Sequence, residues 1–203
     1  MIHDVVKSTF TNIFNTNAWG DMESVSGSCS TEFGTRDLRK KFQSVLKRYG
    51  IEMLLDLPCG DFNWMRHIDM EGIRYIGGDI VSDLILHHRR NYSSPVRQFH
   101  EMDLITTKLP QSDMIFCRDC FVHLSEDLIK LSLVNIKKSN STYLMSTTFP
   151  DIKETSKGSV GGWRPINLCD KVFGLPNPLE LIEDDRRANY GRKCLGIWYI
   201  GDL

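Results

Sequence analysis

Short strand-like runs alternate with helical stretches along most of this chain, and this alternation restricts the fold more than any other feature. The first run, Met53–Leu57, is almost wholly apolar, as strands buried on both faces of a parallel sheet are. Similar runs follow at Ile73–Gly78, Val96–Met102, Met114–Cys117 and Thr142–Thr148. Strands that alternate with helices predict a doubly wound α/β sheet.

Helical spacing fills most of the intervals between these runs. Thr35 is predicted to cap a helix that presents Leu38 and Phe42 on its apolar face and ends at Gly50. Further helices are predicted in the segment that holds Phe10, Ile13 and Trp19, over Asn63–Asp69, over Ser82–Asn91 and over Ser125–Lys138. The basic end of the third of these, His87–Arg90, is expected to be a solvated helix terminus.

The last part of the chain, Pro150–Leu203, departs from the alternating pattern. It holds four of the seven prolines, a long loop and two strand-like pieces, Leu179–Glu183 and Lys193–Ile200. The two pieces predict an antiparallel hairpin at the sheet edge. The expected fold is therefore a Rossmann-like, doubly wound, seven-stranded and mostly parallel sheet with a C-terminal antiparallel hairpin.

Charge and cysteine content restrict the partners and the location. The 25 Lys and Arg residues nearly balance 26 Asp and Glu residues, which argues against an obligate binder of nucleic acid or of anionic membranes. The sequence has neither an apolar run that could span a bilayer nor the layout of a signal peptide. Six scattered cysteines indicate reduced thiols and a cytoplasmic protein, and the Cys117–Cys120 pair lacks the second pair that a zinc site needs.

Acidic residues and one glycine follow the first three predicted strands, at the sheet edge where such folds bind ligands. Asp56 ends the first strand, and Gly60 permits close approach of a ligand to the backbone. Asp79 lies 19 residues beyond Gly60, where a carboxylate can accept both ribose hydroxyl protons, and Asp103 can accept a bond from an adenine amino group. Three acids without a basic cradle favour a nucleoside that lacks phosphates.

Four segments carry a resemblance to a known family: LLDLPCGDF (54–62), YIGGDI (75–80), the Asp103-Leu104 pair and SDMIFCRDCFVHLS (112–125). Over about residues 35–150 the chain resembles the class I S-adenosylmethionine-dependent methyltransferases, in particular small single-domain members. The resemblance implies S-adenosylmethionine as the cofactor. The residues expected to bind it are Trp19, Asp56, Cys59, Gly60, Asp61, Asp79, Ile80, Asp103, Leu104 and Cys117.

The resemblance also implies how the chain is organised. We expect one methyltransferase domain over residues 1–203, with an N-terminal lid (1–34), a cofactor-binding core (35–149) and a segment (150–203) that holds a substrate loop and the hairpin. One departure concerns the glycine-rich loop, because Pro58 and Phe62 stand where the family has flanking glycines. The amino-acid end of the cofactor must then be held differently.

Transfer to a hydroxyl group requires a base as well as close placement of the reactants. Asp119 or His123 is the predicted base, and Arg118 is expected to orient Asp119 or an anionic acceptor. Glu23, in a possible lid with Trp19, and Trp163 and Arg164 of the long loop are further predicted substrate contacts. Other roles compete with each. Asp119 is alternatively a helix cap or a contact for the methionine end of the cofactor, His123 and Trp163 are alternatively packed rings, and the lid is alternatively a plain loop.

The expected activity is methylation of a small polar acceptor, with O-methylation of a sugar or related metabolite favoured and no metal or nucleic acid required. The balanced charge supports a small-molecule acceptor. N-methylation of a small amine or of a protein side chain is the alternative. A non-catalytic domain that binds a nucleoside or a partner protein is the rival from another class, and a nicotinamide-dependent oxidoreductase is disfavoured because GxGxxG is missing. The oligomeric state stays open.

Overall fold

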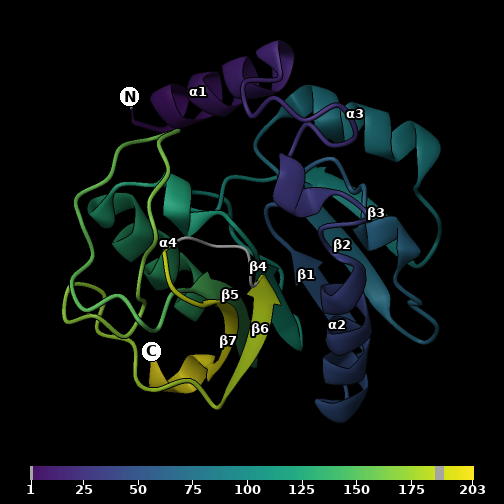
Figure 1. The fold of residues 1–203 in the computed structure, drawn as a ribbon. Coiled ribbons are helices and arrows are strands. Elements are labelled where there is room, and N and C mark those ends of the chain that lie inside the picture. The colour runs from purple at the N-terminus through teal and green to yellow at the C-terminus, as the bar shows by residue number, and fades with distance from the viewer. Residues whose placement is uncertain (1, 186–189) are drawn as a thin grey trace. The chain divides into compact units, whose positions relative to one another are not determined.

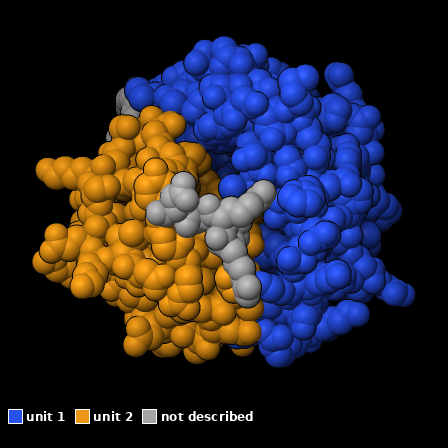
Figure 2. All heavy atoms as spheres, in the orientation of Figure 1, with its two compact units in different colours: residues 1–103 blue, residues 104–203 orange. Residues whose placement is uncertain are grey.

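A computed structural model of the chain describes residues 2–185 and 190–203. The chain divides into two compact units, unit 1 over Met1–Asp103 and unit 2 over Leu104–Leu203, which Figure 2 shows in two colours. In the described residues, no helix combines the length and the apolar character that crossing a bilayer requires.

Unit 1 is built on three parallel strands with helices beside them (Figure 1). The strands, in the order β3-β2-β1, are β1 (Met53–Asp56), β2 (Arg74–Asp79) and β3 (Arg97–Glu101). The helices are α1 (Ile2–Thr16), α2 (Arg36–Arg48) and α3 (Ser82–Asn91). Because the strands are parallel, Asp56, Asp79 and the segment leading to Asp103 lie at one edge of this sheet.

Unit 2 combines a parallel strand pair with an antiparallel hairpin. Its strands follow the order β4-β5-β7-β6, and β7 runs antiparallel to both of its neighbours. They are β4 (Met114–Cys117), β5 (Tyr143–Thr148), β6 (Glu180–Asp185) and β7 (Lys193–Tyr199), and the unit's helix is α4 (Glu126–Lys138). The complete strand order is β3-β2-β1-β4-β5-β7-β6, which confirms the predicted seven-stranded, mostly parallel sheet and its C-terminal hairpin.

Apolar residues at helical spacing give α2 its buried face. Leu38, Phe42 and Val45 are fully buried, and the Phe42 ring packs edge-on against Trp64 at 5.8 Å between centroids. Burial of each such side chain contributes about 1.5–3 kcal/mol. Thr35 stands at the predicted N-cap, but its hydroxyl donates to the carbonyl of Thr31 instead of accepting from the helix.

The helix predicted over Asn63–Asp69 is wrong, because only a 3-10 turn, η2 (Met65–His67), forms there. Its first residue is engaged elsewhere: the Asn63 side-chain amide donates to the Glu23 carboxylate at 2.7 Å and to the Ser30 carbonyl at 3.2 Å. Ile68 already has extended dihedral angles. A segment this short has too few helical hydrogen bonds to offset the cost of starting a helix.

Candidate functional site

The glycine turn after β1 is fixed on both sides of Gly60. This residue has a φ of +54°, in the left-handed region that glycine adopts readily. Its N–H donates to Asp79 Oδ2 at 3.1 Å, and its carbonyl accepts from His88 Nε2 at 2.7 Å. A Cβ at this position would lie 2.5 Å from Ser26 Oγ. The turn therefore has one defined shape, and it has no room for a side chain.

Asp79 is the central carboxylate of this edge. It is 5% exposed, and its second oxygen accepts the N–H of Val81 at 3.0 Å. Burial raises the pKa of Asp79 to about 6, while the backbone bonds from Val81 and Gly60 act in the opposite direction. At neutral pH the group is ionised and can accept further hydrogen bonds, as a ribose diol requires.

Asp56 and Asp103 are buried beside neighbouring strands and already have partners within unit 1. Tyr75 donates its hydroxyl proton to Asp56 Oδ2 at 2.6 Å, and His3 Nδ1 of α1 lies 2.5 Å from Asp103 Oδ2. Burial, followed by the Asp56 charge, raises the pKa of Tyr75 well above its usual value, so the tyrosine stays a donor. A nucleoside at this edge would share these carboxylate oxygens or displace their donors.

Phe62, which follows the glycine turn, also has a left-handed conformation. Its φ is +59°, which costs about 1–3 kcal/mol for a residue with a side chain. Its ring is 2% exposed and lies against Tyr75, Tyr92 and Phe99, with centroids 5.1–5.3 Å away. Burial of an aromatic ring offsets a cost of this size. The loop thus keeps a left-handed residue despite its depleted glycines.

His88 corrects the expectation of a solvated terminus for α3, because its side chain is fully buried. The imidazole packs between Phe62 and Phe99, at 6.0 Å and 5.0 Å between centroids. Burial lowers its pKa, so the ring is neutral at pH 7 and donates from Nε2 to Gly60. Among the described residues Nδ1 has no hydrogen-bond partner, so the Gly60 carbonyl is the one polar contact of this ring.

The N-terminal segment Glu23–Ser30 is bonded to the glycine turn, within unit 1. Ser24 Oγ donates to Asp61 Oδ2 at 2.7 Å, and the Asp61 N–H donates to Ser26 Oγ at 3.1 Å. Glu23 accepts from the Asn63 amide, so its carboxylate anchors this segment. Trp19 is 37% exposed and lies beside Gly27, where an added Cβ would be 3.5 Å from the Trp19 Cβ.

The remaining predicted cofactor residues differ in exposure. Cys59 is buried and burial raises the pKa of its thiol, so it is a neutral, inert group. Leu104 and Cys117 are buried, whereas Ile80 is half-buried. Cofactor contacts of all ten predicted residues stay predictions.

Unit 2 contains a cluster of four charged side chains, the unit 2 quartet: Arg118, Asp119, Asp184 and Lys193. Arg118 donates from Nε and Nη2 to the two oxygens of Asp184, at 3.0 and 3.2 Å. Lys193 Nζ lies 2.6 Å from Asp119 Oδ2 and 3.0 Å from Asp184 Oδ2. The quartet carries two positive and two negative charges, so it is neutral overall.

Asp119 is the quartet member that reaches solvent, with a side chain 25% exposed, and its φ of +52° is another left-handed conformation. Although burial opposes it, the attraction of Lys193 and then Arg118 holds the pKa of Asp119 well below its usual value. Such a carboxylate is a weak base and a good hydrogen-bond acceptor. The arrangement favours Asp119 for orienting a donor, while its predicted role as base is untested.

His123 has the protonation state that a base needs. Its Nδ1–H donates to the carbonyl of Gly162 at 2.7 Å, which places the lone pair of the neutral ring on Nε2. Burial is the main cause that lowers its pKa, so the imidazole is neutral at pH 7. The residue is only 8% exposed, which fits a packed ring. The lone pair on Nε2 fits a catalytic base, so the geometry is compatible with both roles.

Arg164 is 6% exposed, contrary to a simple surface contact for an anionic acceptor. Its Nη1 donates to the carbonyl of Leu124 at 2.6 Å. Nε and Nη2 are buried and have no hydrogen-bond partner among the described residues. Burial lowers the pKa of the guanidinium. Trp163, in contrast, is 48% exposed and packs edge-on against the buried Phe149.

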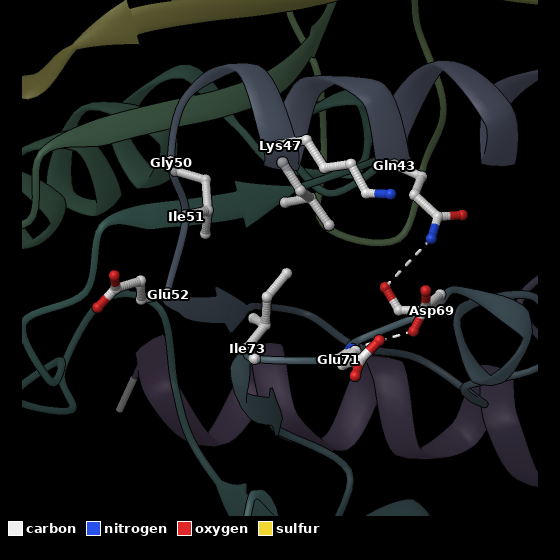
Figure 3. Close-up of a pocket in the computed structure, with 10 residues that line it drawn as sticks. Gln43, Lys47, Gly50, Ile51, Glu52, Asp69, Glu71 and Ile73 are labelled. Atoms are coloured by element: carbon white, nitrogen blue, oxygen red, sulfur yellow. Dashed lines mark hydrogen bonds between the residues drawn. The ribbon is translucent and has the colours of Figure 1, made fainter.

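A cavity of about 380 Å³ lies elsewhere in unit 1 (Figure 3). It is lined by the end of α2 and by Glu52 and Ile73, which immediately precede β1 and β2. This is the amino end of the strands, opposite the edge that holds Asp56 and Asp79. The cavity includes none of the predicted site residues, and we assign it no part in the function.

Sequence reasoning missed three side chains that these contacts bring into the two clusters: His88, Asp184 and Lys193. The His88 signal was available, since it stands four residues after Leu84 and shares its buried face on α3. Lys193 opens an otherwise mostly apolar strand and is 5% exposed, but only the hairpin shows that it meets Asp119. Among the described residues, no group of three His, Cys, Asp or Glu side chains has the arrangement of a metal site.

Comparison with known proteins gives matches in structure alone. No protein-family model and no curated protein sequence matches this chain. Magnesium protoporphyrin IX methyltransferase from Synechocystis, solved with bound S-adenosylhomocysteine, is similar with a TM-score of 0.65 and 12% identity, covering 97% of this chain and 96% of that chain.

Two more solved structures have the same TM-score of 0.65 and 11% identity. The N-methyltransferase NodS from Bradyrhizobium japonicum covers 93% of this chain and 98% of its own. The 1,6-didemethyltoxoflavin-N1-methyltransferase from Burkholderia thailandensis covers 96% and 86%. Both contain S-adenosylhomocysteine. The chain therefore has the Rossmann-like fold that these S-adenosylmethionine-dependent methyltransferases share.

Proposed function

We propose that this chain is a methyltransferase that uses S-adenosylmethionine and acts on a small polar acceptor in the cytoplasm, as one domain over residues 1–203. The observation that carries the proposal is the clamped glycine turn in unit 1. Gly60 is left-handed and is held between Asp79 and His88, at the edge that also carries Asp56 and Asp103. The fold supports the same assignment.

The residues present fit this cofactor. A nucleoside needs carboxylates that accept from ribose and adenine, and the edge offers three of them without a basic phosphate cradle. An added Cβ at Gly60 would meet Ser26 Oγ at 2.5 Å, so packing against the Glu23–Ser30 segment restricts this position to glycine. A depleted glycine loop would favour the non-catalytic rival, and the left-handed φ of Phe62 supports the enzyme instead, because the loop keeps its shape without a second glycine.

The cofactor, when bound, supplies an electrophilic methyl group on a sulfonium. We assign its nucleoside to Asp79, Asp103 and the Gly60 turn. His123 Nε2 would accept the proton of an acceptor hydroxyl, and Asp119 would orient that hydroxyl. The four charges of the unit 2 quartet cancel, which favours a neutral hydroxyl acceptor such as a sugar or related metabolite.

N-methylation is the alternative activity, and rate measurements with His123→Gln separate the two. An amine can lose its proton after attack, so an amine acceptor predicts little loss of rate in this variant. A hydroxyl acceptor predicts a loss of about 10²–10⁴-fold, the usual contribution of a positioned base.

The proposal is tested by calorimetric titration with S-adenosylhomocysteine. We expect micromolar binding by the wild type, about 8 kcal/mol, and loss of binding in Asp79→Ala. Asp83→Ala is the matched control, because it removes an exposed carboxylate four residues further on, in the first turn of α3. Absence of binding by the folded wild-type protein, or equal binding by Asp79→Ala, would contradict the proposal.

A further inference from the structure

Two aromatic side chains of unit 2, Trp163 and Tyr190, form a partly exposed corner. Trp163 is 48% exposed and Tyr190 is 55% exposed, yet their rings are in contact, with centroids 5.0 Å apart and planes inclined by 54°. The buried Phe149 supports the Trp163 ring edge-on at 6.1 Å. An aromatic pair of which about half stays exposed can still pack against a ring-shaped ligand.

The Trp163 side of this corner is fixed to the turn that carries His123. The N–H groups of Gly161 and Arg164 donate to the carbonyls of His123 and Val122, at 3.0 and 3.1 Å. The His123 imidazole donates to the carbonyl of Gly162, the residue before Trp163. A ring held on Trp163 therefore lies next to the segment that supplies the proposed base.

The Tyr190 side is fixed by the residues that follow it. Arg192 pairs with Asp151 through its guanidinium, at 3.0 Å from Nη2, and through its backbone N–H, at 3.0 Å. Gly191 has a φ of +86°, and an added Cβ there would lie 3.2 Å from Asp151 Cβ. The backbone around Trp163 and the backbone that follows Tyr190 are thus held before any ligand arrives, which lowers the ordering cost of binding.

We propose that Trp163 and Tyr190 are the acceptor-stacking site, and that the acceptor is a neutral ring compound carrying a hydroxyl group. This inference rests on the proposed methyl transfer and deepens it by naming the acceptor class. The ring needs an apolar face for Trp163 and a hydroxyl for His123 and Asp119. Aromatic alcohols and pyranosides share this chemistry, and the experiment separates them.

The test is saturation-transfer NMR with two probes, catechol and methyl β-D-glucopyranoside, in the presence of S-adenosylhomocysteine. We expect at least one probe to receive saturation from the wild-type protein. In Trp163→Ala and Tyr190→Ala we expect that signal to fall at least fivefold. Transfer to catechol identifies an aromatic acceptor, and transfer to the glucopyranoside identifies a sugar.

Tyr199→Ala is the matched control, because Tyr199 is 47% exposed and belongs to another aromatic pair of unit 2, with Tyr143 at 6.4 Å. Its signal should equal that of the wild type, and thermal unfolding should show that all three variants are folded. The inference is overturned if neither probe receives saturation from the wild-type protein. It is also overturned if folded Trp163→Ala gives the full wild-type signal.

The calorimetric titration with S-adenosylhomocysteine separates this failure from failure of the proposed function. If the protein binds S-adenosylhomocysteine but neither probe, the stacking site is wrong and the cofactor assignment stands. If it binds a probe at Trp163 but not S-adenosylhomocysteine, the ring site stands and the methyltransferase proposal fails.

Discussion

The His88 contact with the glycine turn gives the sharpest single test of the cofactor edge. His88→Phe keeps a flat ring between Phe62 and Phe99 and removes the donor to the Gly60 carbonyl. The partly buried carbonyl of Gly60 would keep only the weak Cys59 Sγ–H donor at 3.8 Å, and a buried group that loses its partner costs about 1–3 kcal/mol. Part of this cost is returned, because the substitution also removes a buried Nδ1 that has no hydrogen-bond partner in the described chain. We therefore expect a net loss of about 1–2 kcal/mol, a factor of roughly 5–30.

Two measurements on His88→Phe check this magnitude. Urea unfolding should show the stability loss, and calorimetry should show weaker affinity for S-adenosylhomocysteine because the Gly60 turn has lost the His88 contact. His88→Gln is the matched variant, because it retains an amide donor for Gly60 and loses the ring. Its stability should fall further, while its affinity stays closer to that of the wild type. If His88→Phe binds S-adenosylhomocysteine as tightly as the wild type does, this hydrogen bond has no part in shaping the cofactor site.

Three more predictions concern charge and backbone shape. Because the pKa of Asp79 is raised to about 6, its contribution to stability is lost as the pH rises from 3.8 towards 6. Affinity for S-adenosylhomocysteine should instead increase as the pH rises, because the ionised carboxylate binds the ribose. Calorimetric titrations should show about tenfold weaker binding for each pH unit below 6, and Asp79→Asn should abolish this pH dependence. Lys193→Met breaks a buried ion pair and should cost about 3–5 kcal/mol in urea unfolding, whereas Arg192→Met, at an exposed pair, should cost less than about 1 kcal/mol. Equal losses would show that burial of the quartet is unimportant. Gly60→Ala and Gly50→Ala both place a side chain at positive φ, which costs about 1–2 kcal/mol of stability. Only the Gly60 variant also meets Ser26, so only this variant should weaken binding in calorimetry.

The sheet was predictable because its strands and helices are marked by local patterns. The apolar run at β1 and the helical spacing of Leu38 and Phe42 in α2 depend on neighbours within a few residues. The failed helix at Asn63 shows the limit of such patterns. Its amide bonds to Glu23, 40 residues away in sequence, and no local signal contains that contact.

Some contacts among the candidate residues could be expected from the sequence, and contacts between distant segments could not, while the functional roles of these residues stay predictions. Gly60 and Asp79 were identified from their spacing, and the bond between them agrees with a shared task. Lys193 could not be assigned to Asp119 from the sequence, because 74 residues separate them and the pairing depends on the hairpin. His88 was misread because four basic residues in a row conceal one buried position.

Gly158 leaves the space that the charged side chain of Arg164 occupies. A Cβ at this position would lie 1.6 Å from Arg164 Nη1, closer than any two unbonded atoms can be. A substitution at position 158 should therefore displace the end of the Arg164 side chain and break its hydrogen bond to the Leu124 carbonyl. Gly158→Ala would displace the guanidinium while the net charge of the protein stays the same. A library meant to alter acceptor preference should keep this glycine and vary the positions around it.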